Sequence, residues 1–475
     1  MGTTFRISRR RFVVAGAAGL ASLAVAGGLP LAVAGAGEAR FAYVGTYTTN
    51  PPGGGGPLPA VGIAVFRVAA DALTLVQAVP SANPSFLAVH PTQRFLYATN
   101  EIDDYGGQKT GSVEAYAIDQ ATGMLTLLNR QATGGPIPAH LAVAPDGRTL
   151  VIANYVGGNF VALPLGADGA LGPVTNAIQH TGSGPNTDRQ EAPHPHCVAF
   201  DPAGRYIASA DLGIDTIQVF RLDAAGRLVV VGEAKTAPGA GPRHLAFNPD
   251  GRFLYVVSEL NATITVFPYA AATGTLGQAL QTLSTVPANF VGTRSTAEIV
   301  VHPSGKFLYN SNRGQPDATT PEANAIVGYA IDGATGKLTL TGYTTAGIKY
   351  PRNFAIDPTG TWLYACNQQA DTIVPFRIDA ATGRLTATGQ VTPTPTPVCL
   401  VFASPAAGAA PPPAPAPMPG LPNTGGGGMA GDGRAFGPLG AAGLGAAALA
   451  VLARRAQVPD SVAGARAEKP ARPSS

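Results

Sequence analysis

A short turn motif recurs about every fifty residues, and it constrains the fold of this chain more than any other feature. The motif is a proline followed two residues later by a glycine, as in APDGRTL, DPAGRYI and NPDGRFL; one copy, HPTQRFL, lacks the glycine. The turn prolines are separated by 54, 57, 47, 54 and 55 residues and are Pro91, Pro145, Pro202, Pro249, Pro303 and Pro358. In a chain with 60 Gly and 43 Pro, which is built with many turns, such a period is typical of the blades of a β-propeller.

Each repeat contains four short β segments. An apolar strand such as HLAFN precedes the turn, LYVVS follows it, and a third strand such as ITVFPY and a fourth after an ATG turn complete the unit. Six full repeats leave a start, FAYVGTYT onward, without a first strand, and an end, PVCLVF at 397–402, that is a first strand with nothing after it. We therefore predict an all-β, seven-bladed propeller over residues 40–402, with four antiparallel strands per blade. The two chain ends share the seventh blade, which leaves no open sheet edge, and we expect a monomer.

The sequence patterns at the two ends of the chain indicate targeting segments. Residues 1–36 contain SRRRFVV, then a weakly apolar run, then the small residues AVAGAGEA, and this order resembles a twin-arginine export signal. The alternative is a chance basic start on a membrane anchor, which the glycines and the proline inside the apolar run disfavour. We therefore expect a Tat translocase to export the protein.

The C-terminal segment resembles the sorting signal of Gram-positive wall proteins. Residues 403–420 form a Pro/Ala-rich spacer, the LPNTG motif follows at 421–425, then an apolar segment at 436–453 and a basic tail at 454–475. The resemblance implies that a sortase cuts after Thr424 and joins it to peptidoglycan; the motif residues are Leu421, Pro422, Thr424 and Gly425. Eighteen apolar residues suit a transient stop in the membrane better than a permanent helix. The long tail after the arginines departs from the usual pattern, and the alternative is a chance match.

Charge and cysteine content exclude other classes of protein. The net charge is only +3 and no Lys/Arg-rich run lies inside the body of the chain, so nothing indicates nucleic-acid binding. Cys197, Cys366 and Cys399 are too few and too unevenly spaced for a disulfide scaffold or a cysteine-based zinc site. We expect them to be small buried apolar residues.

The repeat register gathers polar side chains at one mouth of the propeller. A proline usually opens the first strand, and in an antiparallel hairpin the start of the first strand lies beside the end of the second. Counting back from the turn predicts that Arg243 faces Ser258 and that His196 faces Asp211. Two groups of residues are assigned structural roles only: His90 and His302 in the turns of the opposite mouth, and Asn100, Asn154 and Asn367 as backbone caps at strand ends.

Six motifs in order give the chain a family resemblance. YVGTYT, NYVGGN, PHPHCVAFDPAGRYIASADLGIDTIQVF, GPRHLAFNPDGRFLYVVSELNATITVF, AEIVVHPSGKFLYNSNRG and PRNFAIDPTGTWLYACNQ together resemble the seven-bladed lactonase family. That family includes 6-phosphogluconolactonases of the propeller type and carboxy-muconate lactonizing enzymes. The resemblance implies a small-molecule lactone as substrate, no cofactor, and an active-site set of His196, Arg243, Arg313 and Glu259.

Lactone hydrolysis suits these residue types on chemical grounds. The reaction requires a base for water, a positive group at the carbonyl oxygen and a proton for the leaving alkoxide. Glu259 is the expected base if burial raises its pKa, with His196 as a second proton carrier. Arg243 and Arg313 are expected to hold a carboxylate or phosphate and to stabilise the oxyanion. The second-line substrate-binding candidates are His140, His244, Glu298 and Arg352.

Two alternatives remain open. His194 and His196 lie two residues apart, but no third ligand is evident and Pro195 interrupts the strand, so we expect no metal site. The second alternative is a wall-bound propeller without turnover that acts as a binding or scaffold module. Because phosphogluconolactone is made inside cells, an exported enzyme is expected to open an extracellular sugar lactone or another cyclic ester.

Overall fold

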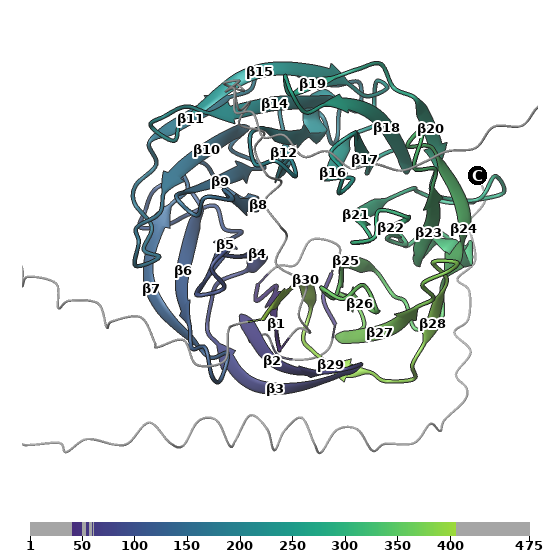
Figure 1. Cartoon of the computed structure of the whole chain (residues 1–475), viewed down its shortest axis with the longest axis horizontal. Helices are drawn as coiled ribbons and strands as arrows, with labels where there is room; N and C mark the ends of the chain where they lie inside the picture. The colour runs from purple at the N-terminus through teal and green to yellow at the C-terminus, as the bar shows by residue number, and fades with distance from the viewer. Residues whose placement is uncertain (1–39, 50–53, 57–58, 60, 405–475) are drawn as a thin grey trace, which may run out of the picture. The chain divides into compact units, whose positions relative to one another are not determined.

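The computed structural model describes residues 40–49, 54–56, 59 and 61–404, and these form seven small sheets arranged in a ring (Figure 1). The predicted propeller with four antiparallel strands per blade is therefore confirmed. The predicted signal (1–36), most of the spacer, the LPNTG motif, the apolar segment and the basic tail lie outside the described residues. Within the described part of the chain, no helix is long and apolar enough to cross a membrane.

In each blade the strand order runs outward from the inner strand at the centre of the ring. Blade 1 contains β30 (Pro397–Ala403), β1 (Phe41–Thr46), β2 (Ile63–Ala69) and β3 (Ala72–Val79). Blade 2 contains β4 (Pro84–Val89), β5 (Phe95–Asn100), β6 (Ser112–Ile118) and β7 (Leu125–Ala132). Blade 3 contains β8 (Pro138–Val143), β9 (Thr149–Asn154), β10 (Asn159–Pro164) and β11 (Asn176–Gln179).

Blade 4 contains β12 (Pro195–Phe200), β13 (Ile207–Asp211), β14 (Thr216–Leu222) and β15 (Leu228–Lys235). Blade 5 contains β16 (Pro242–Phe247), β17 (Phe253–Ser258) and β18 (Thr263–Ala270), which pairs with both β19 (Thr275–Leu276) and β20 (Gln281–Ser284). Blade 6 contains β21 (Thr296–Val301), β22 (Phe307–Asn312), β23 (Ala325–Ile331) and β24 (Leu338–Thr344). Blade 7 contains β25 (Pro351–Ile356), β26 (Trp362–Asn367) and β27 (Thr372–Ile378), with β28 (Leu385–Ala387) and β29 (Thr392–Pro393) as its outer strand. Short 3₁₀ helices follow β13 (η1, Leu212–Ile214) and precede β23 (η2, Pro321–Ala323).

Blade 1 closes the ring by joining the two ends of the described chain. Strand β30 pairs antiparallel with β1, with Tyr43 opposite Val401 and Phe41 opposite Ala403. The purple and yellow strands of this blade lie side by side in Figure 1. The shared blade predicted from the sequence is confirmed, and its inner strand extends one residue beyond the expected end at 402.

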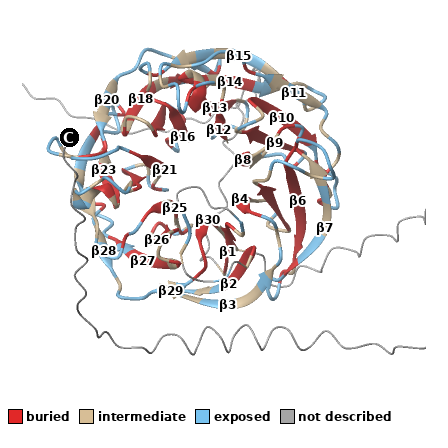
Figure 2. Cartoon of the chain, turned by 180° about the vertical axis from the view of Figure 1, so that it is seen from behind, coloured by how far each residue is buried: buried red, intermediate tan, exposed pale blue. Residues whose placement is uncertain are grey.

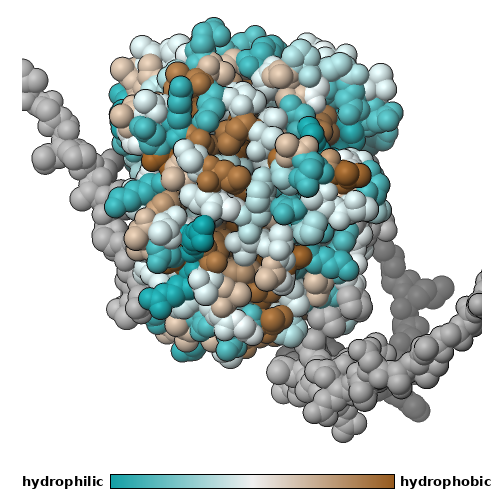
Figure 3. All heavy atoms as spheres, turned by 90° about the vertical axis from the view of Figure 1, so that its right-hand side faces the viewer, coloured by the Kyte–Doolittle hydropathy of each residue, from teal (hydrophilic) through white to brown (hydrophobic). Residues whose placement is uncertain are grey.

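Burial follows the order of strands within each blade. The second and third strands are almost wholly buried, whereas outer strands such as β3, β7 and β15 alternate between covered and exposed residues (Figure 2). On the side of the molecule that Figure 3 shows, apolar patches are small and separated by hydrophilic side chains. The apolar residues therefore serve mainly the contacts between blades, since neighbouring sheets pack face to face.

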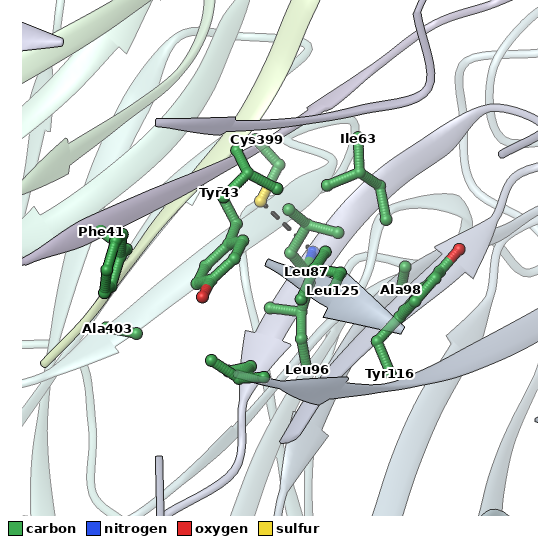
Figure 4. Close-up of a cluster of buried hydrophobic side chains, with 12 residues drawn as sticks. Phe41, Tyr43, Ile63, Leu87, Leu96, Ala98, Tyr116, Leu125, Cys399 and Ala403 are labelled. Carbon is green, nitrogen blue, oxygen red and sulfur yellow. Dashed lines mark hydrogen bonds between the residues drawn. The ribbon is translucent and has the colours of Figure 1, made fainter. Parts of the chain in front are cut away.

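The packing between blades 1 and 2 illustrates these contacts (Figure 4). Phe41 and Tyr43 of β1 pack in one cluster with Leu87 of β4 and Leu96 of β5. Cys399 joins this cluster, and its sulfur accepts a hydrogen bond of 3.3 Å from the Leu87 backbone N–H. Like Cys399, the two other cysteines are free and buried, which confirms their predicted role as small core residues.

Polar links also tie each blade to the next. Tyrosines at the third position of the second strand donate to turn carbonyls of the following blade, as Tyr97 does to Gly169 at 3.0 Å. At the turn mouth, Nε2 of His90 donates to the Gly147 carbonyl at 3.0 Å, and Nε2 of His302 donates to the Gly360 carbonyl at 2.8 Å. The structural roles predicted for these two histidines are confirmed.

Candidate active site

A β-bulge at the start of every inner strand determines which side chains face the interior of the propeller. In blade 5, Pro242 lies opposite Ser258 and His244 opposite Val257, so Arg243 has no cross-strand partner. Five other inner strands also skip one residue, and in β21 the break in the ladder spans Ala297 and Glu298. A bulge re-aims the side chain of the unpaired residue.

The bulges correct the predicted register by one residue. Pro242, and not Arg243, faces Ser258, and Pro195, and not His196, faces Asp211. The prediction assumed a regular hairpin and therefore missed the extra residue. Asp211 is instead engaged by His180, whose Nδ1 lies 2.7 Å from the Asp211 carboxylate.

Several of the unpaired residues, and several residues that follow the second strands, line one cavity of about 530 Å³. Inner strands contribute His196, Arg243 and Arg352, and the ends of second strands contribute Glu259 and Arg313. The structure thus brings together the four residues of the expected active-site set and one second-line candidate. The prediction that they gather at a single mouth is confirmed.

Glu259 lies at the centre of a cluster of arginines. Its Oε2 accepts from Nε of Arg243 at 2.9 Å and lies 2.7 Å from Nη2 of Arg313, while its Oε1 accepts from Nη2 of Arg189 at 2.7 Å. Burial alone would raise the pKa of Glu259, but the three guanidinium charges outweigh it and hold that pKa well below the usual range. The expectation that burial raises the pKa of this carboxyl is therefore wrong. Glu259 is a poorly basic carboxylate that holds the arginines in place.

Arg243 and Arg313 are fixed by the backbone as well as by Glu259. Nη1 of Arg243 donates to the Ala297 carbonyl at 2.9 Å, and Nε and Nη2 of Arg313 donate to the Thr296 carbonyl at 3.0 and 2.6 Å. Burial and the charges of Arg313 and Arg352 lower the pKa of Arg243 to about 9. The site is therefore crowded with positive charge, and both guanidinium groups are oriented before any substrate binds.

Two further arginines on the cavity have no acceptor among the described residues. The guanidinium of Arg352 lies over the ring of Tyr47, 5.1 Å from its centre, and the Tyr47 hydroxyl donates to the Glu101 carboxylate at 2.8 Å. Arg294 lies exposed at the rim. The cavity is lined by five arginines, Arg189, Arg243, Arg294, Arg313 and Arg352, but by only two carboxylates, Glu101 and Glu259. This excess of positive charge favours an anionic ligand.

His196 is a buried imidazole at the edge of the arginine cluster. Its side chain is only about 6% exposed, and its ring lies edge-on to Tyr155 and to His244, with centres 5.6 and 5.1 Å away. Burial, together with the charge of Arg243, lowers the pKa of His196 well below 6.5. The imidazole is therefore neutral at pH 7 and able to accept a proton.

Three second-line candidates do not reach the large cavity. In β8 and β16, His140 and His244 directly follow the unpaired residue. In β21, Glu298 is the second residue of the break in the ladder. His140 packs on Phe86, with ring centres 3.8 Å apart. His244 donates from Nδ1 to Oε1 of Glu298 at 2.9 Å. In β8 and β16 the residues that line the large cavity are the preceding ones, Ala139 and Arg243.

Two arginines on the cavity, Arg189 and Arg294, were not among the residues predicted from the sequence. Arg189 belongs to the segment between β11 and β12, and Arg294 lies two residues before β21. Both segments lead into the start of an inner strand, which is the mouth of the cavity. Arg294, two residues before β21, could have been found as a cation beside the start of an inner strand, whereas Arg189 lies six residues before β12 in a segment without a repeat and gave no such signal.

No group of three or more His, Cys, Asp or Glu side chains is placed to hold a metal ion in the described ranges. His194 stacks on Tyr155, with ring centres 4.4 Å apart, and its Nε2 lies 2.9 Å from the Glu191 carboxylate. The strand-end asparagines bind backbone groups as expected; for example, Asn154 donates to the Thr133 carbonyl at 2.8 Å.

Comparison with known proteins gives consistent matches over the propeller. Residues 41–402 match the family model described as "Lactonase, 7-bladed beta-propeller". A 6-phosphogluconolactonase of Bacillus subtilis is 34% identical over 69% of this chain and 88% of the relative, and one of Formosa agariphila is 33% identical over 69% and 89%. The solved structure of a periplasmic gluconolactonase from Pseudomonas aeruginosa is 30% identical, covers 77% of this chain and 99% of its own, and superposes with a TM-score of 0.68.

Proposed function

Because the chain belongs to the seven-bladed β-propeller lactonase family, we propose that it hydrolyses a sugar lactone or related cyclic ester that carries a carboxylate or phosphate group. The observation that carries the choice of an anionic substrate is the excess of arginines over carboxylates on the 530 Å³ cavity. The relatives named 6-phosphogluconolactonase and gluconolactonase support a lactone as the reacting group.

In the proposed reaction, His196 acts as the general base. Its neutral imidazole takes a proton from a water molecule, and the resulting hydroxide adds to the lactone carbonyl carbon. The imidazolium then returns that proton to the ring oxygen as the acyl–oxygen bond breaks. The product is an open-chain hydroxy acid, and no other reactant is consumed.

Arg243 and Arg313 stabilise the oxyanion in this mechanism. Glu259 and the carbonyls of Thr296 and Ala297 already hold both guanidinium groups, so little reorganisation is needed as negative charge develops on the carbonyl oxygen. Glu259 is then a positioning residue, since a carboxylate bound by three guanidiniums is a weak base.

Arg352 binds the anionic substituent of the substrate. Its guanidinium has no acceptor among the described residues and is held in place by the Tyr47 ring. A planar guanidinium recognises carboxylate or phosphate with two parallel hydrogen bonds. Arg294 at the rim adds attraction over a longer range.

A panel of lactones assayed in a pH-stat tests this function. We expect hydrolysis by the purified propeller, with a higher kcat/KM for a lactone that carries a carboxylate or phosphate than for its neutral analogue. A preference for the neutral analogue would overturn the assigned substrate class. No hydrolysis of any panel member would instead favour the non-catalytic binding module.

We further propose that this lactonase acts outside the cytoplasm, attached to the cell wall through Thr424. The proposal rests on the twin-arginine and LPNTG patterns in the sequence, and a periplasmic gluconolactonase among the related structures is consistent with an exported enzyme. Changing Arg9 and Arg10 to Lys should retain the protein in the cytoplasm, and Thr424→Ala should release it from the wall fraction. A wild-type protein that remains in the cytoplasm with both termini intact would contradict this proposal.

A further inference from the structure

A second, small cavity lies beside the large one. It is lined both by residues that are unpaired at the bulges and by residues that directly follow them in the inner strands. Its volume is about 10 Å³, close to the smallest space that holds one water molecule. Ser85, His196 and His244 are among its lining residues. Each of these three carries a buried polar atom without a hydrogen-bond partner in the described part of the chain, namely Ser85 Oγ, His196 Nδ1 and His244 Nε2.

The state of His244 follows from its contact with Glu298. Burial raises the pKa of Glu298, but hydrogen bonds and charges from His244 and others outweigh it and lower that pKa below its usual value, so Glu298 is a carboxylate that only accepts. The 2.9 Å contact therefore places a hydrogen on Nδ1 of His244. Burial lowers the pKa of His244 as well, so the ring is neutral at pH 7 and its Nε2 is an unpaired acceptor.

The proposed base His196 needs a hydrogen-bond acceptor at Nδ1, the ring nitrogen that does not take the proton. If Nε2 of His196 takes a proton from water, Nδ1 must carry a hydrogen throughout, and a buried N–H without an acceptor is destabilising by about 1–3 kcal/mol. No described residue accepts from this nitrogen directly. The rings of His196 and His244 lie 5.1 Å apart between centres, and both line the small cavity, so one water molecule can bridge them.

We propose that His244 and Glu298 form a positioning pair that acts on His196 through one water molecule in the small cavity. The water accepts from Nδ1 of His196 and donates to Nε2 of His244 and to Oγ of Ser85, which gives the three hydrogen bonds typical of a buried water. The relay fixes His196 in the tautomer with a free Nε2. It also places the Glu298 charge where it stabilises the imidazolium formed during turnover. This inference rests on the proposed lactonase function for its kinetic consequence only.

Other contacts keep the pair rigid. Oε2 of Glu298 accepts from Nδ2 of Asn353 at 2.6 Å, and Oδ1 of Asn353 accepts from the Leu400 backbone N–H at 2.9 Å. The Ile299 backbone N–H donates to Oε1 of Glu298 at 2.9 Å. The carboxylate is thus fixed between blades 5, 6, 7 and 1, as expected of a residue that orients another group.

The first test is kinetic and uses Glu298→Gln, which keeps the shape of the side chain but removes its charge. We expect kcat to fall by about 10- to 100-fold with KM within about twofold of the wild type. The acid limb of the kcat profile should move to lower pH, because loss of a nearby negative charge makes the imidazolium of His196 less stable. The other charged or titratable groups around His196 are unchanged in this variant: Arg243, His244, Arg352, Tyr155, Glu101 and, across the large cavity, Glu259.

Glu114→Gln is the matched control. Glu114 of β6 is also a buried carboxylate in an ion pair, with Arg130, and it lines neither cavity. Its kcat and pH profile should equal those of the wild type even if its melting temperature falls. Ser85→Ala removes one partner of the water without touching the pair and should lower kcat by a smaller factor than Glu298→Gln.

The second test does not depend on turnover. In protein labelled with ¹⁵N-histidine, the nitrogen shifts of His196, assigned by comparison with His196→Gln, should show hydrogen on Nδ1 in the wild type and a mixture of tautomers in Glu298→Gln. Hydrogen on Nε2 in the wild type would overturn the relay, as would unchanged kcat and pH profile in Glu298→Gln. If no lactone is opened but the tautomers behave as stated, the relay stands and the proposed function fails.

Discussion

Replacing Glu259 with Gln separates two roles that this carboxylate could have. If Glu259 were the base, the variant would lose turnover and keep its stability. In the structure, however, the carboxylate neutralises the side chains of Arg243 and Arg313, which are only 3% and 5% exposed. We therefore expect Glu259→Gln to lower both activity and stability.

The size of the stability loss follows from the burial of these partners. Removing one partner of a buried ion pair is destabilising by about 3–5 kcal/mol, and the lower end applies because Gln still accepts one hydrogen bond. The propeller domain, taken as residues 41–402, gains roughly 0.76 kcal/mol/K of entropy on unfolding, at about 2.1 cal/mol/K per residue. A loss of about 3 kcal/mol then lowers Tm by about 4 °C.

Calorimetry and the lactone assay on the same preparations measure both effects. Glu233→Gln, the same change at an exposed position on β15, should leave Tm and turnover within error of the wild type. A Glu259→Gln protein with unchanged Tm and a turnover reduced by 10²-fold or more would show that the carboxylate is the base after all. Such a result would return His196 to the role of second proton carrier.

Three further predictions concern the substrate, the pH profile and the closure of the ring. Arg352→Gln should raise KM for an anionic lactone by at least about tenfold, with little change for its neutral analogue; equal effects on both would contradict its assignment to the anionic substituent. Because the pKa of His196 is lowered well below 6.5, the base stays unprotonated as pH falls from 8 to 6. The value of kcat/KM should therefore be constant over this range and fall only at lower pH. A decline centred near pH 7 would exclude His196 as the general base. A propeller ending at Thr396 lacks β30, so β1 keeps β2 as its neighbour but loses the strand on its inner edge. Calorimetry should therefore show a lower and broader transition than for a propeller ending at Ser404, and identical transitions would disprove that β30 closes the ring.

The sequence predicted the architecture well because the repeat reports it directly. Each turn proline lies at a fixed distance from two apolar strands, and the incomplete segments at 41–48 and 397–402 could only complete one another. The approximate place of the site followed, since Arg243 and Glu259 belong to one hairpin. All of this information is local in the chain or periodic.

The details that failed depend on tertiary contacts. A bulge adds one residue without changing the spacing of the strands, so the register at Arg243 was displaced by one. The low pKa of Glu259 arises from arginines supplied by three separate segments, and Arg189 among them lies in a loop without a repeat. The pattern of strands does not predict which charged side chains from separate segments come into contact.

The bulge at the start of each inner strand also bears on how a site of this kind changes during evolution. Six inner strands each carry one residue without a cross-strand partner, namely Ser85, Ala139, His196, Arg243, Arg352 and Val398, and in β21 both Ala297 and Glu298 lack one. Four of these residues, Ala139, His196, Arg243 and Arg352, line the large cavity, so a substitution there alters its chemistry while the ladder on either side stays the same. Small residues such as Ala139 are therefore the positions at which a new substrate could be selected with little loss of fold stability.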